Sequence, residues 1–122
     1  MPELPEVETT RLGLVPRIVG RRIHEVVVRE PRLRWPVPRD LAARLRGSVV
    51  QAIRRRGKYL LFDCGTGHLL VHLGMSGRLT IVPPDRPLRR HDHVDIAFEG
   101  GDVVRFNDPR RFGAMLWVRD PA

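Results

Sequence analysis

The chain has 122 residues, the size of one domain that can bury a sizeable core. Its 22 basic and 14 acidic residues leave a formal net charge of +8, which favours a polyanionic partner, most often nucleic acid, over an arginine-biased composition without function. The single cysteine, Cys64, excludes a disulfide framework and a cysteine zinc cluster within the chain. With no signal-peptide pattern and no apolar run near the roughly 20 residues of a membrane span, we expect a cytoplasmic protein.

Two helices are predicted. The first covers residues 5–19, because proline suits the first helical position and acidic residues follow it. Its core-facing stripe is expected to comprise Leu4, Val7, Leu14 and Ile18, and Pro16 to bend the helix or end it early. A short second helix is predicted over residues 38–46, with Leu41 and Leu45 on one face.

The rest of the chain alternates between apolar and polar residues in short runs separated by turn residues. Strands are predicted over residues 23–29, 49–53, 59–62, 68–73, 78–82, 94–98, 103–106 and 114–118, and the basic run 54–58 is expected to lie between two of them. This pattern predicts a mainly β (α+β) fold, a two-sheet antiparallel β-sandwich or flattened barrel. The first helix is expected to cover one edge, and residues 83–90 to form a proline- and arginine-rich loop.

The amino terminus carries the first candidate chemistry. If Met1 is removed, the ring nitrogen of Pro2 becomes a free secondary amine, which can attack an electrophilic carbon and form an iminium ion. Glu3 and Glu6 are within reach to act as general acid and base. The simpler interpretation is that these prolines and glutamates only start a helix well. While Met1 remains, the Pro2 nitrogen is an amide and the chemistry is switched off.

Three further segments fit a nucleic-acid partner. Lys58, the only lysine among 21 arginines, can contact phosphate or carry a proton, or it can be a solvated turn residue. Met75, in a glycine-flanked turn, is expected to be exposed and able to wedge into a base stack, unless it folds back on the core.

The third segment is the turn at residues 108–113. Arg110, Arg111 and Phe112 combine guanidinium groups with an aromatic ring, which suits phosphate or base-edge contact and stacking, although a packed turn with solvated arginines has the same composition. For His91 and His93 we favour hydrogen bonding or phosphate contact over metal binding, because no third ligand is identifiable.

Together these motifs resemble the bacterial formamidopyrimidine-DNA glycosylases, also called 8-oxoguanine DNA glycosylases. The resemblance lies in residues 1–9, 32–36, 57–60, 72–77, 91–95 and 108–113, in the expected order along essentially the whole chain. The related endonuclease VIII group, which acts on oxidised pyrimidines, typically has glycine where this chain has Leu4, so the first family is favoured.

The resemblance implies roles for individual residues. Pro2 corresponds to the nucleophile that attacks C1′, Glu3 to the acid that assists sugar opening, and Glu6 to a supporting carboxylate. Lys58 corresponds to the lysine of strand cleavage and phosphate contact. The remaining positions correspond to the trio that fills the gap left by a flipped base (Met75, Arg110, Phe112) and to a further DNA contact (His91).

The implied activity is that of a bifunctional DNA glycosylase/AP lyase that excises oxidised purines from duplex DNA as a monomer. Family members also carry a second half, with a helix-two-turn-helix unit and a zinc finger, that this chain lacks. We therefore expect an amino-terminal catalytic domain that needs no cofactor of its own, binds DNA weakly and excises little or no base alone. The alternatives are a non-catalytic basic DNA-binding module and a small-molecule enzyme that uses an amino-terminal proline.

Overall fold

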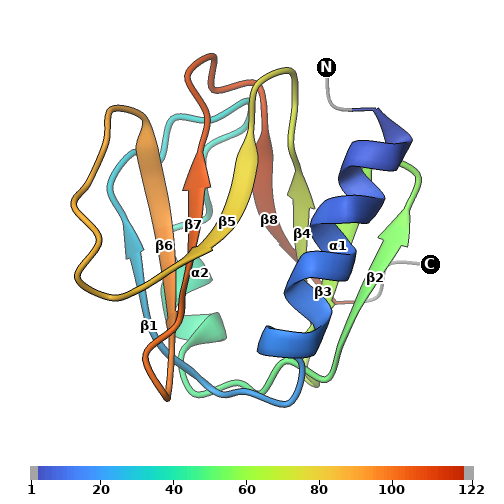
Figure 1. Cartoon of the computed structure of the whole chain (residues 1–122), viewed down its shortest axis with the longest axis vertical. Helices are drawn as coiled ribbons and strands as arrows, with labels where there is room; N and C mark the ends of the chain where they lie inside the picture. Colours follow the sequence, from blue (N-terminus) through green and yellow to red (C-terminus); the bar gives the residue numbers. More distant parts are fainter. Residues whose placement is uncertain (1–2, 120–122) are drawn as a thin grey trace.

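The computed structural model describes residues 3–119, and these form two four-stranded antiparallel sheets with two helices (Figure 1). The helices are α1 (Leu4–Ile18) and α2 (Leu41–Leu45). The strands are β1 (Ile23–Val28), β2 (Ala52–Arg56), β3 (Tyr59–Asp63), β4 (His68–His72), β5 (Arg78–Val82), β6 (Asp92–Phe98), β7 (Val103–Asn107) and β8 (Ala114–Val118). One sheet has the order β1-β6-β7-β5 and the other β2-β3-β4-β8, which confirms the predicted sandwich.

The core lies between the two sheets because alternate residues of each strand point inward. Leu69 and Val71 of β4 face Val94 of β6 and Phe106 of β7 in one buried cluster, and each is at most 1% exposed. Cys64 is also buried, which raises the pKa of its thiol to about 11 and leaves it a poor nucleophile.

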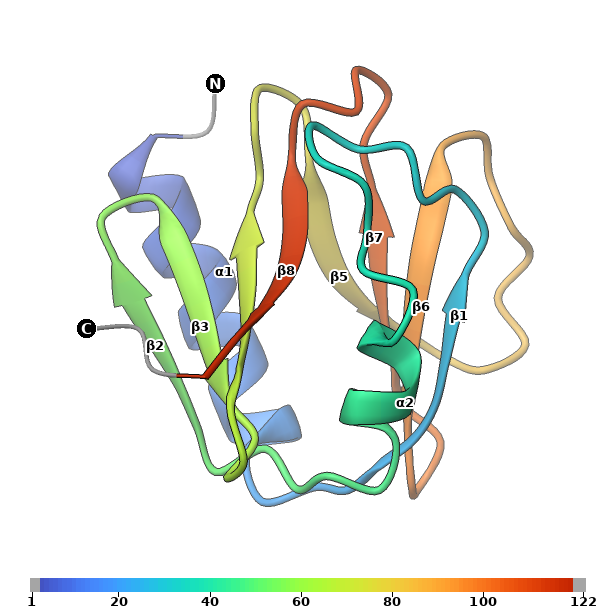
Figure 2. The same ribbon diagram turned by 180° about the vertical axis from the view of Figure 1, so that it is seen from behind.

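The helices close the two open sides of the sandwich. Helix α1 packs against β2 and β5, an edge strand of each sheet, as the predicted edge cover requires (Figure 1). Seen from behind, α2 lies between β1 and β8 at the opposite side, and its Leu41 and Leu45 are fully buried (Figure 2). No helix within residues 3–119 is long and apolar enough to cross a membrane.

Three local predictions were wrong. Leu4 is 44% exposed, because the first turn of α1 projects past the strand ends, so only Val7, Leu14 and Ile18 form the buried stripe. Helix α2 begins at Leu41 rather than at residue 38, since the Leu41 amide closes a turn on the Pro38 carbonyl instead.

The third error concerns the basic run. Strand β2 covers residues 52–56 rather than the predicted 49–53, so only Gly57 and Lys58 form the connecting turn. An edge strand tolerates this run because its polar side chains face solvent or the neighbouring helix. Pro16 lies within α1, which ends two residues later, at Ile18.

Candidate nucleic-acid interface

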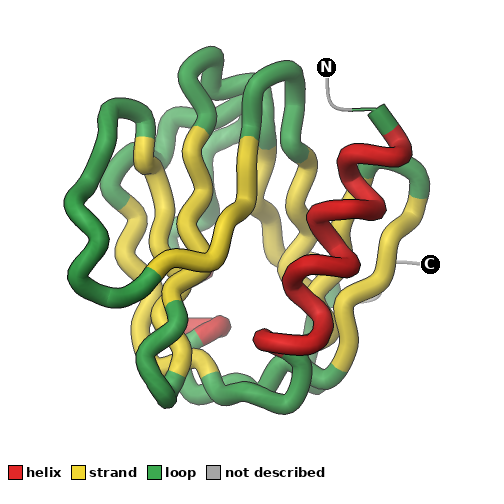
Figure 3. Tube along the Cα trace, viewed as in Figure 1, coloured by secondary structure: helices red, strands yellow, loops and turns green. Residues whose placement is uncertain are grey.

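The amino-terminal end of α1 lies at the same end of the sandwich as the β2–β3, β4–β5 and β7–β8 connections (Figure 3). Glu3 is the amino-terminal cap of α1, and its carbonyl accepts a hydrogen bond from the Val7 amide at 3.0 Å. Its carboxylate is exposed, and Oε2 lies 3.7 Å from Nζ of Lys58 in the β2–β3 turn. Pro2, the predicted nucleophile, lies outside the described residues.

Lys58 sits on a turn that α1 holds in place. Glu8 of α1 accepts from Arg55 of β2 at 3.0 Å, and the same guanidinium donates to the Gly57 carbonyl at 3.1 Å. Hydrogen bonds from Arg11, and then from Arg55, lower the pKa of Glu8 to about 2. Glu8 therefore stays ionised, and this chain of contacts ties the Lys58 turn to the helix that carries Glu3.

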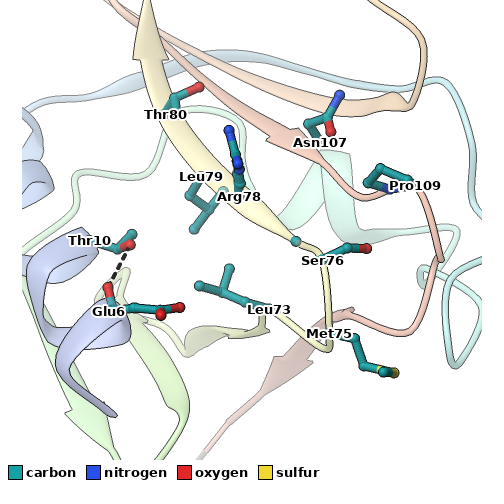
Figure 4. Close-up of a pocket in the computed structure, with 11 residues that line it drawn as sticks. Glu6, Thr10, Leu73, Met75, Ser76, Arg78, Leu79, Thr80, Asn107 and Pro109 are labelled. Carbon is teal, nitrogen blue, oxygen red and sulfur yellow. Dashed lines mark hydrogen bonds between the residues drawn. The ribbon is translucent and has the colours of Figure 1, made fainter. Parts of the chain in front are cut away.

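Glu6 lines a cavity of about 690 Å³ between α1 and β5 (Figure 4). The opposite wall includes Met75 and Ser76 of the β4–β5 turn and Arg78 at the start of β5. Met75 is 44% exposed, and its side chain points away from β5 rather than back to the core (Figure 4). The structure thus places an apolar side chain at the rim of a cavity that also contains a carboxylate.

The β4–β5 turn packs directly on the β7–β8 loop. Gly74 has φ +63°, and a Cβ on it would lie 2.6 Å from the Gly113 nitrogen, so only glycine fits this contact. Phe112, which directly precedes Gly113 in the loop, is 45% exposed. Met75 and Phe112 are consequently two exposed apolar side chains on loops in direct backbone contact.

Asp108 is fully buried and connects three loops. Its carboxylate accepts hydrogen bonds from Ser76 Oγ and from the Gly113 amide, both at 2.8 Å. Its own amide donates to the His91 carbonyl at 3.1 Å. Ser76 Oγ also accepts from the Arg110 amide at 3.2 Å, so Asp108 holds the predicted DNA-contacting residues of all three loops in one network.

Two non-glycine residues of this network have left-handed backbone conformations, His91 with φ +70° and Arg111 with φ +58°. Such a conformation costs a few kcal/mol at most and persists only where surrounding contacts impose it. Here the Arg111 amide donates to the Asp108 carbonyl at 3.2 Å, and His93 Nε2 lies 2.7 Å from the same oxygen. His93 is therefore buried and hydrogen-bonded, whereas His91 is exposed.

His72 supports the β4–β5 turn from below. Its Nδ1 accepts a hydrogen bond from the Gly74 amide at 2.9 Å, which requires that nitrogen to be unprotonated. The Tyr59 ring packs edge-on at 4.8 Å. Burial, and then the positive charges of Arg34 and Lys58, lower the pKa of His72. The turn that carries Met75 thus depends on a neutral histidine.

The predicted site residues fall into linked groups. Glu3 pairs with Lys58, and Glu6 shares a cavity with Met75. Arg110, Arg111 and Phe112 line a shallower cavity of about 430 Å³ against residues 32–34. Within residues 3–119, no three His, Cys, Asp or Glu side chains gather as they would to hold a metal ion.

Sequence reasoning assigned no role to three residues of this site: Glu8, Ser76 and Asp108. Asp108 lies in the 108–113 motif, where an aspartate before proline signals a turn, but its partner Ser76 is 32 positions away. The link from Glu8 to Arg55 spans 47 positions. Neither link is encoded in a local pattern.

Comparisons with known proteins agree with this geometry. Residues 1–115 match the model of the formamidopyrimidine-DNA glycosylase N-terminal domain. The formamidopyrimidine-DNA glycosylase of Thioalkalivibrio sulfidiphilus is 60% identical over 122 residues, all of this chain and 45% of that protein. That of Stenotrophomonas maltophilia strain R551-3 is 58% identical over 117 residues, 96% of this chain and 43% of its own length.

Solved structures give the same result. Lactococcus lactis FPG (MutM) in complex with Fapy-dG-containing DNA has a TM-score of 0.87 at 36% identity, over 95% of this chain and 44% of that one. MutM in complex with DNA containing carbocyclic 8-oxo-G has a TM-score of 0.88 at 38% identity, over 96% and 44%. The chain therefore spans less than half the length of these relatives.

Proposed function

We propose a function from the premise that this chain belongs to the formamidopyrimidine-DNA glycosylase family, as the match over residues 1–115 shows. It is the catalytic domain of a bifunctional DNA glycosylase/AP lyase that removes oxidised purines, such as 8-oxoguanine and formamidopyrimidines, from duplex DNA. The observation that supports this most directly is the Glu3–Lys58 pair, 3.7 Å apart, at the start of α1. It brings an acid and a lysine to the amino terminus, where Pro2 supplies the amine.

The proposed reaction begins once Met1 has been removed. The Pro2 nitrogen attacks C1′ of the damaged nucleotide, and the bond from C1′ to the base breaks, with the base taking the electron pair and a proton. Glu3 donates a proton to the sugar ring oxygen as the ring opens, and an iminium ion between Pro2 and C1′ results. The iminium acidifies the C2′ proton, so β-elimination and then δ-elimination expel the flanking phosphates, with Lys58 assisting proton transfer and contacting the backbone.

The exposed side chains at the loops support base flipping. A base must leave the stack before its C1′ can be attacked, and an inserted apolar side chain holds the gap open. Met75, Arg110 and Phe112 fill this role in the proposal, because Met75 and Phe112 are exposed on contacting loops and Arg110 is anchored through Ser76. The cavity between Glu6 and Met75, about 690 Å³, has room for an extruded base.

The partner in this proposal is damaged double-stranded DNA, bound by one copy of the protein in the bacterial cytoplasm. The net charge of +8 suits the phosphate backbone and predicts strongly salt-dependent binding, with His91 and Arg111 proposed as DNA contacts. Because the relatives are more than twice as long, we propose that a further half of the protein, holding a zinc ion, supplies additional DNA contacts.

Borohydride trapping tests the covalent step. Duplex DNA with an abasic aldehyde needs no base excision, so it reports on the Pro2 amine alone. Two samples of the same chain are compared after intact-mass measurement, one beginning at Pro2 and one retaining Met1. We expect a reduced protein–DNA adduct, mapped to Pro2, only in the first sample. A folded sample that begins at Pro2 and yields no adduct would leave the non-catalytic DNA-binding module as the function of this chain.

A further inference from the structure

A second basic groove lies beside the proposed site, on the outer face of the β5–β7 sheet. Its cavity, about 500 Å³, is bounded by strand β5, by β7 and by the loop at residues 83–91. Its lining includes Arg78 of β5 and Arg86, Arg89 and Arg90 of the loop. None of the catalytic or wedge steps proposed above uses these four arginines.

These four arginines differ from the fifth arginine that lines the groove. Arg105 is buried and pairs with Asp95 at 2.9 Å and with Asp92 at 3.8 Å, so its charge is neutralised. Within residues 3–119, the guanidinium groups of Arg78, Arg86, Arg89 and Arg90 have no carboxylate at ion-pairing distance. Asp85, in the same loop, does not line the groove. The groove therefore carries a surplus of positive charge.

The loop that carries three of these arginines is held in place by hydrogen bonds to its main chain. The Arg105 guanidinium donates to the carbonyls of Arg86 and Pro87, at 3.2 and 3.3 Å. The Arg89 amide donates to Asp92 at 2.7 Å, and Asn107 Nδ2 donates to the Arg90 carbonyl at 2.9 Å. A buried ion-pair cluster thus fixes the main chain, while the arginine side chains stay exposed.

The groove continues from the cavity that contains Glu6 and Met75. The two cavities share Arg78, Thr80, Asn107 and Pro109 in their linings. His91, the predicted DNA contact, lies in the second groove and not in the first. A polyanion that passes the wedge can therefore follow one continuous concave surface to the arginine loop.

We propose that this groove, formed by Arg78, Arg86, Arg89 and Arg90, binds the phosphodiester backbone of duplex DNA on one side of the lesion. The proposal rests on the proposed function, because it takes the position of the lesion from the wedge. The loop crosses about two strand spacings of roughly 4.8 Å from β5. These two spacings are about 10 Å, so at about 3.4 Å per base pair the loop reaches phosphates about three base pairs beyond those that lie at β5.

A pair of charge-matched double variants tests the groove. R86S/R89S removes two groove arginines whose structural hydrogen bonds are made by the main chain, so folding is retained. R39S/R46S removes two exposed arginines that flank α2, away from the site. Binding to a duplex with a reduced abasic site is measured by fluorescence anisotropy over a range of salt concentrations. The slope of log K against log salt should fall by about 2 in R86S/R89S and stay near wild type in the control.

Duplex length separates groove contact from a general loss of charge. On duplexes with about ten base pairs on each side of the lesion, R86S/R89S should bind about tenfold more weakly than R39S/R46S. Shortening one arm to about two base pairs should abolish that difference, and shortening the other should not. Equal losses in the two variants, or a difference that persists on both shortened duplexes, would overturn the proposal.

Failure of the groove and failure of the proposed function give different results. If the groove is wrong, borohydride trapping at Pro2 still succeeds and the variants bind alike. If the chemistry is wrong, the length-dependent difference persists while no adduct forms.

Discussion

The connections at the two ends of strand β7 differ in their residues and backbone conformations. At its start, the turn from β6 places positive φ angles on Gly100 and Gly101, and Asp102 binds Arg17 and Arg21 at 2.8 and 3.2 Å. At its end, the β7–β8 loop places a positive φ on Arg111 and leaves Phe112 exposed.

The two ends differ in how their backbone conformations and charges are supported. At the first end, glycines adopt the left-handed conformation without strain, and the single carboxylate of Asp102 pairs with both arginines. At the second end, the buried carboxylate of Asp108 supports a loop that holds a strained Arg111 backbone and an exposed Phe112 ring. Matched substitutions at the two ends should therefore differ in the size of their effects on stability and on the proposed function.

The largest difference is expected between Glu3→Gln and Glu99→Gln. Glu3 lies 3.7 Å from Lys58, whereas Glu99 is exposed in the β6–β7 turn at the opposite end. On the full-length protein, E3Q should slow single-turnover release of 8-oxoguanine by about 10²–10⁴-fold, as expected for loss of a general acid, and E99Q should have almost no effect. Unchanged release in E3Q would remove Glu3 from the mechanism.

Next in size is the contrast between Asp108→Asn and Asp102→Asn. In D108N the side-chain oxygen can still accept the hydrogen bond from the Gly113 amide. The new NH₂ group, however, replaces the oxygen that accepts from the Ser76 hydroxyl, in a fully buried site. D108N should cost about 1–3 kcal/mol of unfolding free energy in urea titrations. D102N loses only partly exposed ion pairs and should cost less than about 1 kcal/mol. A reversed order would contradict the assignment of Asp108 as the support of these loops.

A smaller difference is expected between Ser76→Ala and Ser48→Ala. Ser76 Oγ joins Asp108 to the Arg110 amide, while Ser48 Oγ donates to the Arg44 carbonyl near α2. S76A should lower stability by about 1 kcal/mol and weaken the fluorescence rise of 2-aminopurine placed opposite an abasic site, because Arg110 loses its anchor. S48A should leave the fluorescence unchanged. Restoration by S76T would assign the effect to the hydroxyl.

The smallest expected effect is a pH dependence of the β4–β5 turn. The pKa of His72 is lowered, so the folded state binds the proton less readily than the unfolded chain. Its stabilising contribution is complete above the ordinary pKa of about 6.5 and is lost as pH falls through the lower, folded-state value. In NMR titrations, the Gly74 amide proton should shift with a midpoint below about 6.5, and H72Q should abolish that transition. A midpoint above that value would show that the pKa of His72 is raised in the folded protein and would contradict the prediction.

Regular alternation made most strands predictable. Strands β5 and β8 match their predicted ranges because each is a short segment rich in apolar residues between well-marked turns. Strand β2 was missed at Arg54–Arg56, since three consecutive arginines resemble a turn until α1 supplies Glu8 as a partner. Leu4 looked like core because helical spacing does not reveal where the sheets end.

The site was predictable to the extent that it lies in short motifs. The exposure of Met75 followed from its position in a turn. The supports did not, because Ser76 with Asp108, and Glu8 with Arg55, meet only after the sheets have formed. The predicted role of Pro2 stays a prediction, since that residue lies outside those described.

The buried stripe of α1 also fixes how far the helix is rotated about its own axis. Val7, Leu14 and Ile18 lock the azimuth of the helix against the sandwich. Each residue of an α-helix advances about 100° and about 1.5 Å. One residue inserted between Glu3 and Val7 would therefore swing Glu3 away from Lys58 without changing any residue of the site. The position of Glu3 relative to Lys58 is thus set by buried side chains that lie one to about four helical turns further along α1.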